Sequence, residues 1–470
     1  MSVVARLAAA CLLPSFPGTT APEWVLRRLE QGLGGITLFA DNIGDAEQLA
    51  ALTGSLRSAG AGLLAIDEEG GDVTRLEAAC GSSFPGNLAL GRVDDASLTA
   101  AVAAAIAGEL AAAGINLNLA PVADVNTNPE NPVIGVRSFG ADPEPVARHV
   151  AAFVEGTQRQ GVAACAKHFP GHGDTSVDSH VALPVADGDL EAALLPFRAA
   201  IAAGVKAVMT AHVVVPELDE QPATLSRRVL NGVLRDELGF DGLVVTDALE
   251  MRAICAGIGV PEAAVRALAA GADALCLGHH LHEEAVATVV DEIVAAVGDA
   301  RLPLDRLEEA AARVGACATW AAAPSAAGAP DRAVGAEAAR RALRVRAPAP
   351  DGAPFVVELV PAANIAAGES VHGLAQLWPA ASGIRLAETD GPPDVPDGRP
   401  LVLVVRDAAR HEWQRELVRR HPHALVIETG VPGGVPAGVD TYGAGRVNLE
   451  AVVEALGPRV DSPVERLHVR

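Results

Sequence analysis

The chain has 470 residues, half of them hydrophobic, and a formal net charge of −23 at pH 7. That length accommodates two domains. The acidic balance argues against nucleic acids and membrane surfaces as partners, because both attract basic patches. No apolar stretch approaches the roughly 18 uninterrupted residues that a membrane helix needs.

The six cysteines lie far apart, and no two of them form a C-x-x-C pair. Three of them, Cys11, Cys165 and Cys276, fall within apolar runs. This pattern is typical of reduced, packed thiols rather than of a disulfide framework. The first segment resembles a buried strand more than an export signal. Both features predict a cytoplasmic protein.

The first two thirds of the chain alternate short apolar strands with helical stretches rich in Ala, Leu, Glu and Arg. Near-continuous apolar strands are typical of parallel sheets that are covered on both faces. Eight strand–helix units predict a closed (β/α)8 barrel of the TIM type, and a doubly wound open sheet is the alternative. The expected strands are residues 6–14, 34–40, 62–71, 116–125, 162–171, 207–216, 242–251 and 272–278.

Residues 322–335 are rich in proline and small residues, which predicts a linker between a barrel domain (1–321) and a second domain (336–470). The second domain contains strand–helix–strand patterns, so we expect a smaller α/β domain with an open parallel sheet. It lacks a Gly-rich phosphate loop that opens a helix. We expect it to shape the rim of the barrel or to be structural, and we assign no catalytic residue to it.

Several predicted barrel strands begin apolar and end in charged residues. Asp67 ends the third strand, Lys167 and His168 the fifth, and Asp247 the seventh. Because the carboxyl ends of barrel strands meet at one rim, where active sites lie, we expect these side chains to gather there. Asp67 and Arg75 could accept and donate hydrogen bonds to sugar hydroxyls, although a local ion pair explains them equally well.

Lysine is almost absent, since only Lys167 and Lys206 occur among the 36 basic residues. A chain that uses arginine as its general cation is expected to keep lysine where a compact ammonium with three donors is required. Lys167 also opens an unusual stretch, KHFPGHGDTSVDSH, which holds three histidines and two aspartates.

Two chemistries are open for this stretch. In one, Asp178 and His180 point to the same side of an extended loop, and the carboxylate helps the imidazole to act as a general acid and base. The other is a metal site, although the spacing matches no zinc signature. The residues of that metal site would be His168, His172, Asp174, Asp178 and His180.

Four motifs, IDEEGG, APVADVNTNPENPVIGVRSFG, KHFPGHGDTSVDSH and GFDGLVVTDALEM, resemble in their order the β-N-acetylglucosaminidase branch of glycoside hydrolase family 3. The resemblance covers the first two thirds of the chain and implies a retaining mechanism on a (β/α)8 barrel. It implies that Asp247 is the nucleophile and that His180, paired with Asp178, is the acid/base. The residues that it assigns to the N-acetylglucosamine ring are Asp67, Arg75, Arg137, Lys167 and His168.

Two positions depart from the family pattern. Glu68 replaces the commoner Gln of DQEGG, and Ala248 follows the nucleophile position where many relatives have a second Asp. The second domain resembles that of longer family members more weakly. The expected acid/base is a histidine on a barrel loop, which argues against the β-glucosidase branch.

The resemblance implies an exo-acting enzyme that cleaves terminal β-linked N-acetylglucosamine from peptidoglycan- or chitin-derived fragments without a cofactor or metal. A histidine acid/base does not repel an incoming anion, so a phosphorylase that uses inorganic phosphate as acceptor is an alternative. A metal-dependent barrel hydrolase and a sugar-binding protein without turnover are alternatives from other classes.

Overall fold

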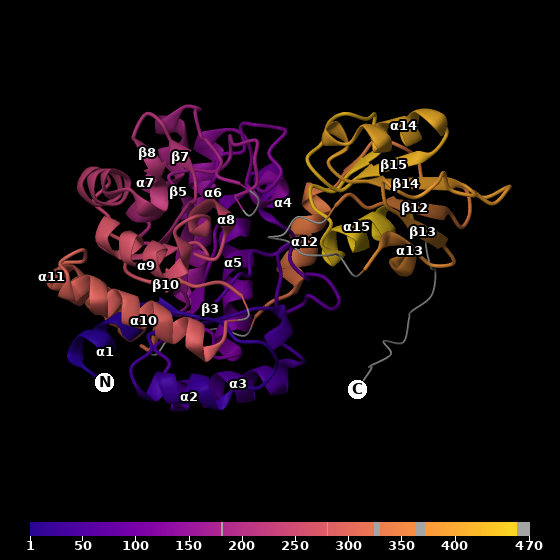
Figure 1. Ribbon diagram of the computed structural model, residues 1–470. Coiled ribbons are helices and arrows are strands. Elements are labelled where there is room, and N and C mark those ends of the chain that lie inside the picture. The colour runs from indigo at the N-terminus through magenta and orange to yellow at the C-terminus, as the bar shows by residue number, and fades with distance from the viewer. Residues whose placement is uncertain (180–181, 280, 324–329, 363–371, 458–470) are drawn as a thin grey trace.

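The computed structural model describes residues 1–179, 182–279, 281–323, 330–362 and 372–457. A barrel lies beside a smaller sheet, with one helix between them (Figure 1). Within the described ranges, no helix combines the length and the apolar character needed to cross a membrane.

The predicted (β/α)8 barrel is confirmed. Its strands are β1 (Leu12–Leu13), β2 (Gly35–Leu38), β3 (Leu63–Ile66), β4 (Leu117–Asn118), β5 (Ala163–Phe169), β6 (Ala207–Thr210), β9 (Leu243–Thr246) and β10 (Leu275–Cys276). Six of them form a parallel sheet in the order β2-β3-β4-β5-β6-β9, and β1 pairs in parallel with β10. A bridge between Val245 and Ala274 joins β9 to β10, and the amide of Thr37 donates to the carbonyl of Pro14 beside β1 at 3.0 Å.

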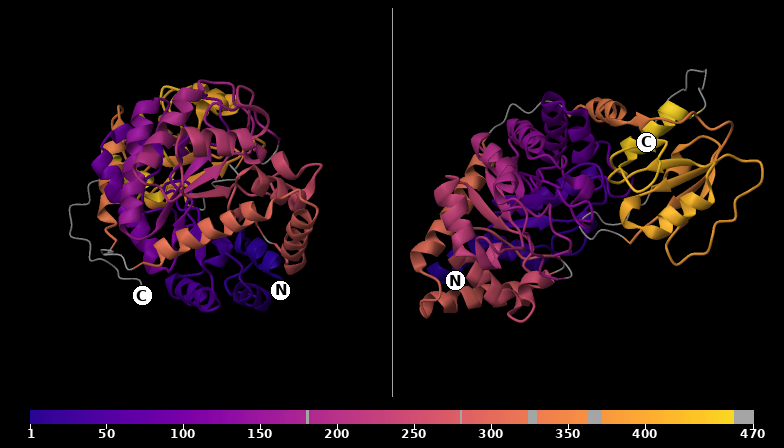
Figure 2. Two further views of the ribbon diagram at one scale, coloured as in Figure 1. Left: turned by 90° about the vertical axis from the view of Figure 1, so that its left-hand side faces the viewer. Right: turned by 90° about the horizontal axis from the view of Figure 1, so that it is seen from above.

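The strands are buried because side chains pack against them from both sides. Helices surround the strands of the barrel (Figure 2). One apolar cluster fills the barrel interior, and a larger one lies between the strands and these helices. The surrounding helices are α1 (Val3–Ala10), α2 (Glu23–Glu30), α3 (Ala46–Ser58), α4 (Asn87–Val93), α5 (Ala96–Ala112), α6 (Pro143–Arg159), α7 (Leu190–Ala202), α8 (Arg252–Cys255), α9 (Gly259–Ala270), α10 (Glu283–Gly298) and α11 (Leu304–Ala321). Shorter or irregular elements are η1 (Ala40–Asn42), η2 (Gly135–Arg137), η3 (Ala223–Leu225), the π-helix η4 (Arg228–Glu237) and the hairpin β7 (Val214–Val215) with β8 (Asp219–Pro222).

The first expected strand, residues 6–14, is wrong over most of its length. The chain forms α1 up to Ala10, and only Leu12–Leu13 pair as β1. The hydroxyl of Ser2 accepts a hydrogen bond from the amide of Ala5 and caps the helix. Alanine has the highest helix propensity, so this capped, Ala-rich segment forms a helix before the strand begins.

The open sheet expected in the second domain is present, with one antiparallel edge strand. The strand order is β11-β16-β15-β14-β12-β13, and only the β11–β16 pair is antiparallel. Helices α13 and α15 cover one face of this sheet and α14 covers the other. Its elements are α12 (Ala333–Ala342), β11 (Arg344–Val345), β12 (Phe355–Leu359), α13 (Leu374–Leu377), β13 (Ser382–Leu386), β14 (Leu401–Val405), η5 (Ala408–Arg410), α14 (Glu412–Arg420), β15 (Leu425–Glu428), β16 (Val439–Asp440) and α15 (Arg446–Leu456).

Helix α12 connects the two parts of the molecule. Its Ala338 belongs to the apolar core of the barrel, whereas its Ala339 packs against Val447 and Ala451 of α15. The helix begins inside the expected linker, 322–335, of which residues 324–329 lie outside the described ranges. The domain boundaries drawn from the sequence therefore stay a prediction.

Candidate active site

Charged side chains follow the carboxyl ends of three barrel strands, as the sequence predicts. Asp67 follows β3, Lys167 lies near the end of β5, and Asp247 follows β9. Because all three strands run parallel in one sheet, their carboxyl ends lie on the same rim of the barrel. This rim is the candidate active site.

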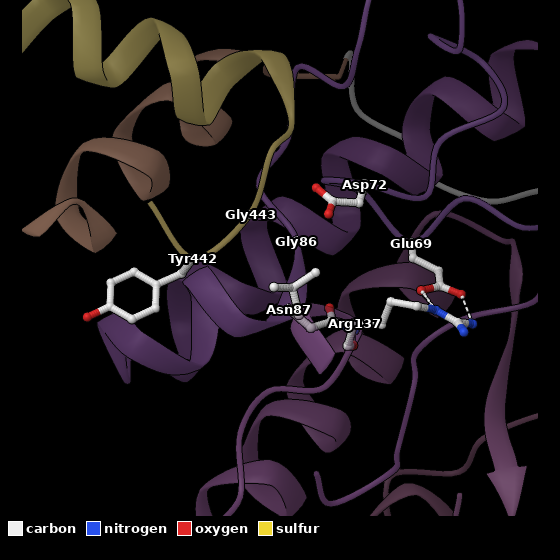
Figure 3. Close-up of a pocket in the computed structure, with 9 residues that line it drawn as sticks. Glu69, Asp72, Gly86, Asn87, Arg137, Tyr442 and Gly443 are labelled. Carbon is white, nitrogen blue, oxygen red and sulfur yellow. Dashed lines mark hydrogen bonds and ion pairs between the residues drawn. The ribbon is translucent and has the colours of Figure 1, made fainter. Parts of the chain in front are cut away.

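A buried ionic network brings four of the predicted sugar-binding residues together around Glu69. The ammonium of Lys167 lies 2.6 Å from one carboxylate oxygen of Asp67 and 2.6 Å from one of Glu69. The guanidinium of Arg137 binds both oxygens of Glu69, at 2.8 and 3.0 Å (Figure 3). Arg75 lies 3.9 Å from Asp67. The rim thus holds two fixed carboxylates between three cations.

Charge pairing outweighs burial in this network. Burial by itself raises the pKa of Glu69, but the charges of Arg137 and Lys167 hold that pKa far below its usual value. Burial likewise lowers the pKa of Lys167, but Asp67 and Glu69 outweigh it and raise that pKa. Both groups are therefore charged at neutral pH, although their side chains are only 3% and 2% exposed.

His168 belongs to a second buried group, which is centred on Asp124. Asp124 accepts hydrogen bonds from the ring Nδ1 of His168 at 2.7 Å and from the amide of His172 at 2.7 Å. Burial raises the pKa of Asp124, but the charge of His168 and the hydrogen bonds from the His168 ring and the His172 amide together outweigh it, so that pKa lies below its usual value. This carboxylate fixes the orientation of the His168 ring.

Asp247 is half-buried beside these two groups. One of its carboxylate oxygens accepts the amide of Ala248 at 2.8 Å, and the carbonyl of Ala248 lies 3.0 Å from Nε2 of His212. Asp247 is also near enough to His172 to affect its titration. Burial lowers the pKa of His172 to about 4, against the opposing charges of Asp124 and Asp247. His172 is therefore neutral at pH 7.

Asp178 lies on the loop that follows β5. The carboxylate of Asp174 closes the base of this loop by accepting the amides of Asp187 and Gly188 at 3.1 and 2.6 Å. The hydroxyl of Ser179 lies 3.3 Å from Nε2 of His172. His180, the predicted acid/base, lies outside the described residues.

The structure assigns hydrogen-bond partners to several members of the metal-site hypothesis. His168 contacts Asp124, His172 contacts Thr175 and Ser179, and Asp174 accepts two backbone amides. Among the residues that the structure describes, no three His, Cys, Asp or Glu side chains are arranged to hold a metal ion. His180 is not among those residues.

A cleft of about 860 Å³ lies between the rim and the second domain. Asp178 and the loop around residues 131–137 line its barrel side. The carboxyl ends of β12 and β14 line its other side. In open α/β sheets, ligands bind outside the carboxyl ends of strands, where consecutive connections turn in opposite directions. The β12–β14 neighbourhood has that topology.

Sequence reasoning missed two residues that organise the rim, namely Glu69 and Asp124, and named His172 only as a candidate metal ligand. Glu69 and Asp124 are visible in the sequence as charged residues near the predicted site residues. A single sequence does not say which of several adjacent carboxylates turns inward, and the family resemblance points to Asp67 alone. Asp124 ends the fourth predicted strand, and that position was the available signal for it.

Residues 17–316 match the model of the glycosyl hydrolase family 3 N terminal domain. A curated relative, beta-hexosaminidase A from Pseudoalteromonas piscicida, is 37% identical over 314 residues. That match covers 60% of this chain and only 52% of the relative, so the chain spans about half of the relative's length.

Two solved structures are similar to the chain over different extents. A family 3 β-N-acetylglucosaminidase from Paenibacillus sp. str. FPU-7 superposes with a TM-score of 0.85 at 32% identity, covering 97% of this chain and 96% of that one. NagZ from Neisseria gonorrhoeae, in complex with N-trifluoroacetyl-D-glucosamine, superposes with a TM-score of 0.53 at 31% identity. It covers 66% of this chain and 98% of that one.

Proposed function

This chain belongs to glycosyl hydrolase family 3, and on that basis we propose that it is a retaining, exo-acting β-N-acetylglucosaminidase. The observation that carries the proposal is the rim itself. A buried network of Asp67, Glu69, Lys167 and Arg137 lies at the same end of the barrel as Asp247. The similarity to a β-N-acetylglucosaminidase over nearly the whole chain supports the same activity.

In the first step, the carboxylate of Asp247 attacks the anomeric carbon of the sugar. The glycosidic C–O bond breaks while His180 donates a proton to the leaving oxygen. The products are an ester between the sugar and Asp247, and the leaving group as an alcohol. Asp178 assists by stabilising the protonated imidazole before the transfer.

In the second step, the neutral His180 removes a proton from water. The water oxygen attacks the anomeric carbon from the face that the leaving group vacated, and the bond to Asp247 breaks. The two displacements together retain the β configuration. Inorganic phosphate could replace water here, which would make the enzyme a phosphorylase and the product a glycosyl phosphate.

The network around Glu69 is suited to binding a terminal sugar ring. Asp67 is 20% exposed and Arg75 14% exposed, so both retain atoms that a ligand can reach. A fixed carboxylate accepts hydrogen bonds from hydroxyls, and a guanidinium donates them. Glu69, almost fully buried, keeps Lys167 and Arg137 in place. Prearranged partners of this kind reduce the cost of binding.

We assign the leaving group to the cleft that Asp178 lines. The acid must reach the oxygen between the two sugars, so the second sugar lies on the side of the Asp178 loop. Both peptidoglycan and chitin fragments fit this description. A comparison of kcat/KM for N,N′-diacetylchitobiose and for an N-acetylglucosaminyl-anhydromuramoyl peptide would decide between them.

We also propose a cytoplasmic location, because all six cysteines are free thiols. Fractionation of the cells that make the protein tests this directly. Recovery from an extracellular or periplasmic fraction would contradict it.

The first experiment compares the purified protein and Asp247→Ala on a 4-nitrophenyl N-acetyl-β-glucosaminide and on the matching glucoside. We expect release from the N-acetyl sugar only, and a loss of about 10⁴-fold or more in the variant. Added phosphate separates the two acceptors, because a phosphorylase forms the sugar phosphate. Activity that disappears after chelation would support the metal-dependent alternative, and binding without turnover would support a sugar-binding protein.

A further inference from the structure

The loop that carries Asp67 and Arg75 is a tight turn, which we name the grip hairpin (residues 67–75). The amide of Glu69 donates to the carbonyl of Val73 at 3.0 Å. The turn itself uses Gly70 and Gly71, which have φ angles of 81° and 60° that favour glycine. Because glycine has no side chain, Gly70 and Gly71 add no side-chain contacts at the tip of the hairpin.

The second domain holds that tip. Asp72, next to the glycines, is only 3% exposed and accepts the guanidinium of Arg406 at 2.5 Å. Its other carboxylate oxygen accepts the amide of Ala444 at 2.7 Å. Figure 3 shows Asp72 near Gly443 and beside the pair of Glu69 and Arg137, and these residues line one small pocket.

The backbones of the two domains also approach each other at the tip of the hairpin. A Cβ atom on Gly445 would lie 3.1 Å from the Cα of Gly71, so a side chain at Gly445 would crowd the hairpin backbone. The second domain thus contributes a charge pair and a close backbone approach at the tip. These add to the hydrogen bond that the amide of Gly71 donates to the carbonyl of Phe84 in the barrel domain at 2.8 Å. Arg406 directly follows β14, which is a largely buried strand of the second sheet.

We propose that Arg406 is a positioning residue, which holds the grip hairpin in the conformation that binds the sugar by pairing with Asp72. This rests on the proposed function, because it assumes that Asp67 and Arg75 bind the sugar ring. It assigns to the second domain a role in the first domain's site. Arg406 acts through Asp72 and does not need to touch the reacting atoms.

Loss of the pair has a specific kinetic signature. Without Arg406 the hairpin occupies its binding conformation for a smaller fraction of the time, and the apparent affinity falls by that fraction. Once the substrate is bound, the chemistry at Asp247 is unchanged. KM therefore rises while kcat is kept.

The test compares Arg406→Gln with Arg446→Gln. Arg446 also joins the two domains, through the hydroxyl of Ser83 and the carboxylate of Glu77, but it does not contact the grip hairpin. The two side chains are equally exposed, at 24% and 23%. We expect Arg406→Gln to raise KM for the 4-nitrophenyl substrate about 10-fold with kcat unchanged, because a hydrogen-bonded charge pair is lost. Arg446→Gln should leave KM unchanged.

A second pair of variants separates positioning from direct contact with the substrate. Asp72→Asn breaks the same ion pair while Arg406 stays present, so it should raise KM to a similar extent. The double variant Asp72→Asn/Arg406→Gln should be no worse than the worse single variant, because both changes remove one interaction. Additive increases in KM would mean that Arg406 contacts the substrate itself, and would overturn the proposal.

A readout without substrate keeps the test independent of the proposed activity. Hydrogen–deuterium exchange should become faster at the amides of the grip hairpin in Arg406→Gln and not in Arg446→Gln. Equal exchange in both variants, or an unchanged KM in Arg406→Gln, would overturn the inference. Inactive wild-type protein with faster hairpin exchange in Arg406→Gln would instead reject the proposed function and keep the mechanical role of Arg406.

Discussion

Two buried clusters of paired charges lie at opposite ends of the barrel, and only one of them has the features of a site. At the carboxyl rim, Glu69 and Asp67 pair with Lys167. At the amino end, Asp273 precedes β10 and accepts Arg235 at 2.7 Å and the amide of Val244 at 2.9 Å. Arg306 and Arg313 contact its other oxygen.

The carboxylate of the amino-end cluster is closed. Asp273 is fully buried, and Nη1 of Arg235 donates to the carbonyls of Phe240 and Gly242 at 2.6 and 2.7 Å. At the rim, by contrast, the side chain of Asp67 is 20% exposed. Charge pairing alone therefore does not mark a site. Position at the carboxyl end and atoms left open to a ligand do.

The two clusters also differ in how burial and pairing balance. At Asp273, burial outweighs the attraction of its arginines, so the pKa of this carboxyl is raised. At Glu69, burial is outweighed by Arg137 and Lys167, so the pKa is lowered. Burial thus prevails at Asp273, and pairing with the two cations prevails at Glu69.

Replacement of Lys167 should give the largest effect at the rim. Lys167→Arg keeps the charge but cannot place three donors between Asp67 and Glu69, so we expect kcat/KM to fall by about 100- to 1,000-fold, as when a prearranged donor is lost. Lys206→Arg is the matched control, because Lys206 lies over the ring of Trp320, 5.1 Å from its centre. A steady-state assay of both variants decides, and equal activities would contradict a special role for Lys167.

Asp273→Asn should affect stability and leave activity intact. The change leaves the partly buried Arg235, Arg306 and Arg313 around a neutral side chain, which should lower the free energy of unfolding by about 3 kcal/mol. Urea unfolding measures this loss, and kcat/KM is measured below the unfolding transition. A fall in kcat/KM of the folded variant would contradict the assignment of a purely structural role to the amino-end cluster.

Glu68→Gln should change stability in a way that depends on pH. Burial raises the pKa of Glu68 from 4.5 to about 7, so the native state holds its proton longer than the unfolded state does. Stability is therefore lost as pH rises from about 4.5 to about 7, by up to about 3 kcal/mol. The amide of glutamine carries no such cost, so the variant should gain stability relative to the wild type at pH 8 but not at pH 4.

The Glu68 measurement also bears on the family pattern, in which glutamine is the commoner residue at this position. The carboxylate of Glu68 accepts the amides of Arg75 and Leu76 at 2.8 and 2.9 Å. Glutamine can accept both with its carbonyl oxygen. If the free energies of unfolding of the wild type and of Glu68→Gln changed with pH in parallel between about 4.5 and about 7, Glu68 would be charged in the native state across that range.

Much of the barrel could be predicted because its signals are local. Apolar runs that end in a charged residue indicate buried parallel strands, and each of the eight predicted ranges contains the observed strand. The first range was wrong over most of its length because an alanine-rich segment satisfies the pattern of a buried strand and of a helix equally well. The cap at Ser2 decided between them.

The partners of the site residues could not be predicted in the same way. Glu69 lies two residues from Asp67, and which of the two meets Arg137 depends on how the grip hairpin turns. Asp72 pairs with Arg406, 334 residues further along the chain. No spacing rule links such positions. The role of His180 stays a prediction, since that residue lies outside the described part of the chain.

The sequence by itself determined the barrel, the residues at the ends of its strands and the family, because strand periodicity, the rarity of lysine and the motifs are properties of neighbouring residues. Only the tertiary structure decided which charges meet, which cluster keeps an exposed carboxylate, and that the second domain contacts the hairpin of the first. Electrostatic pairing acts through distances of a few ångströms in space. Those distances exist only once strands far apart in the sequence have been brought to one rim.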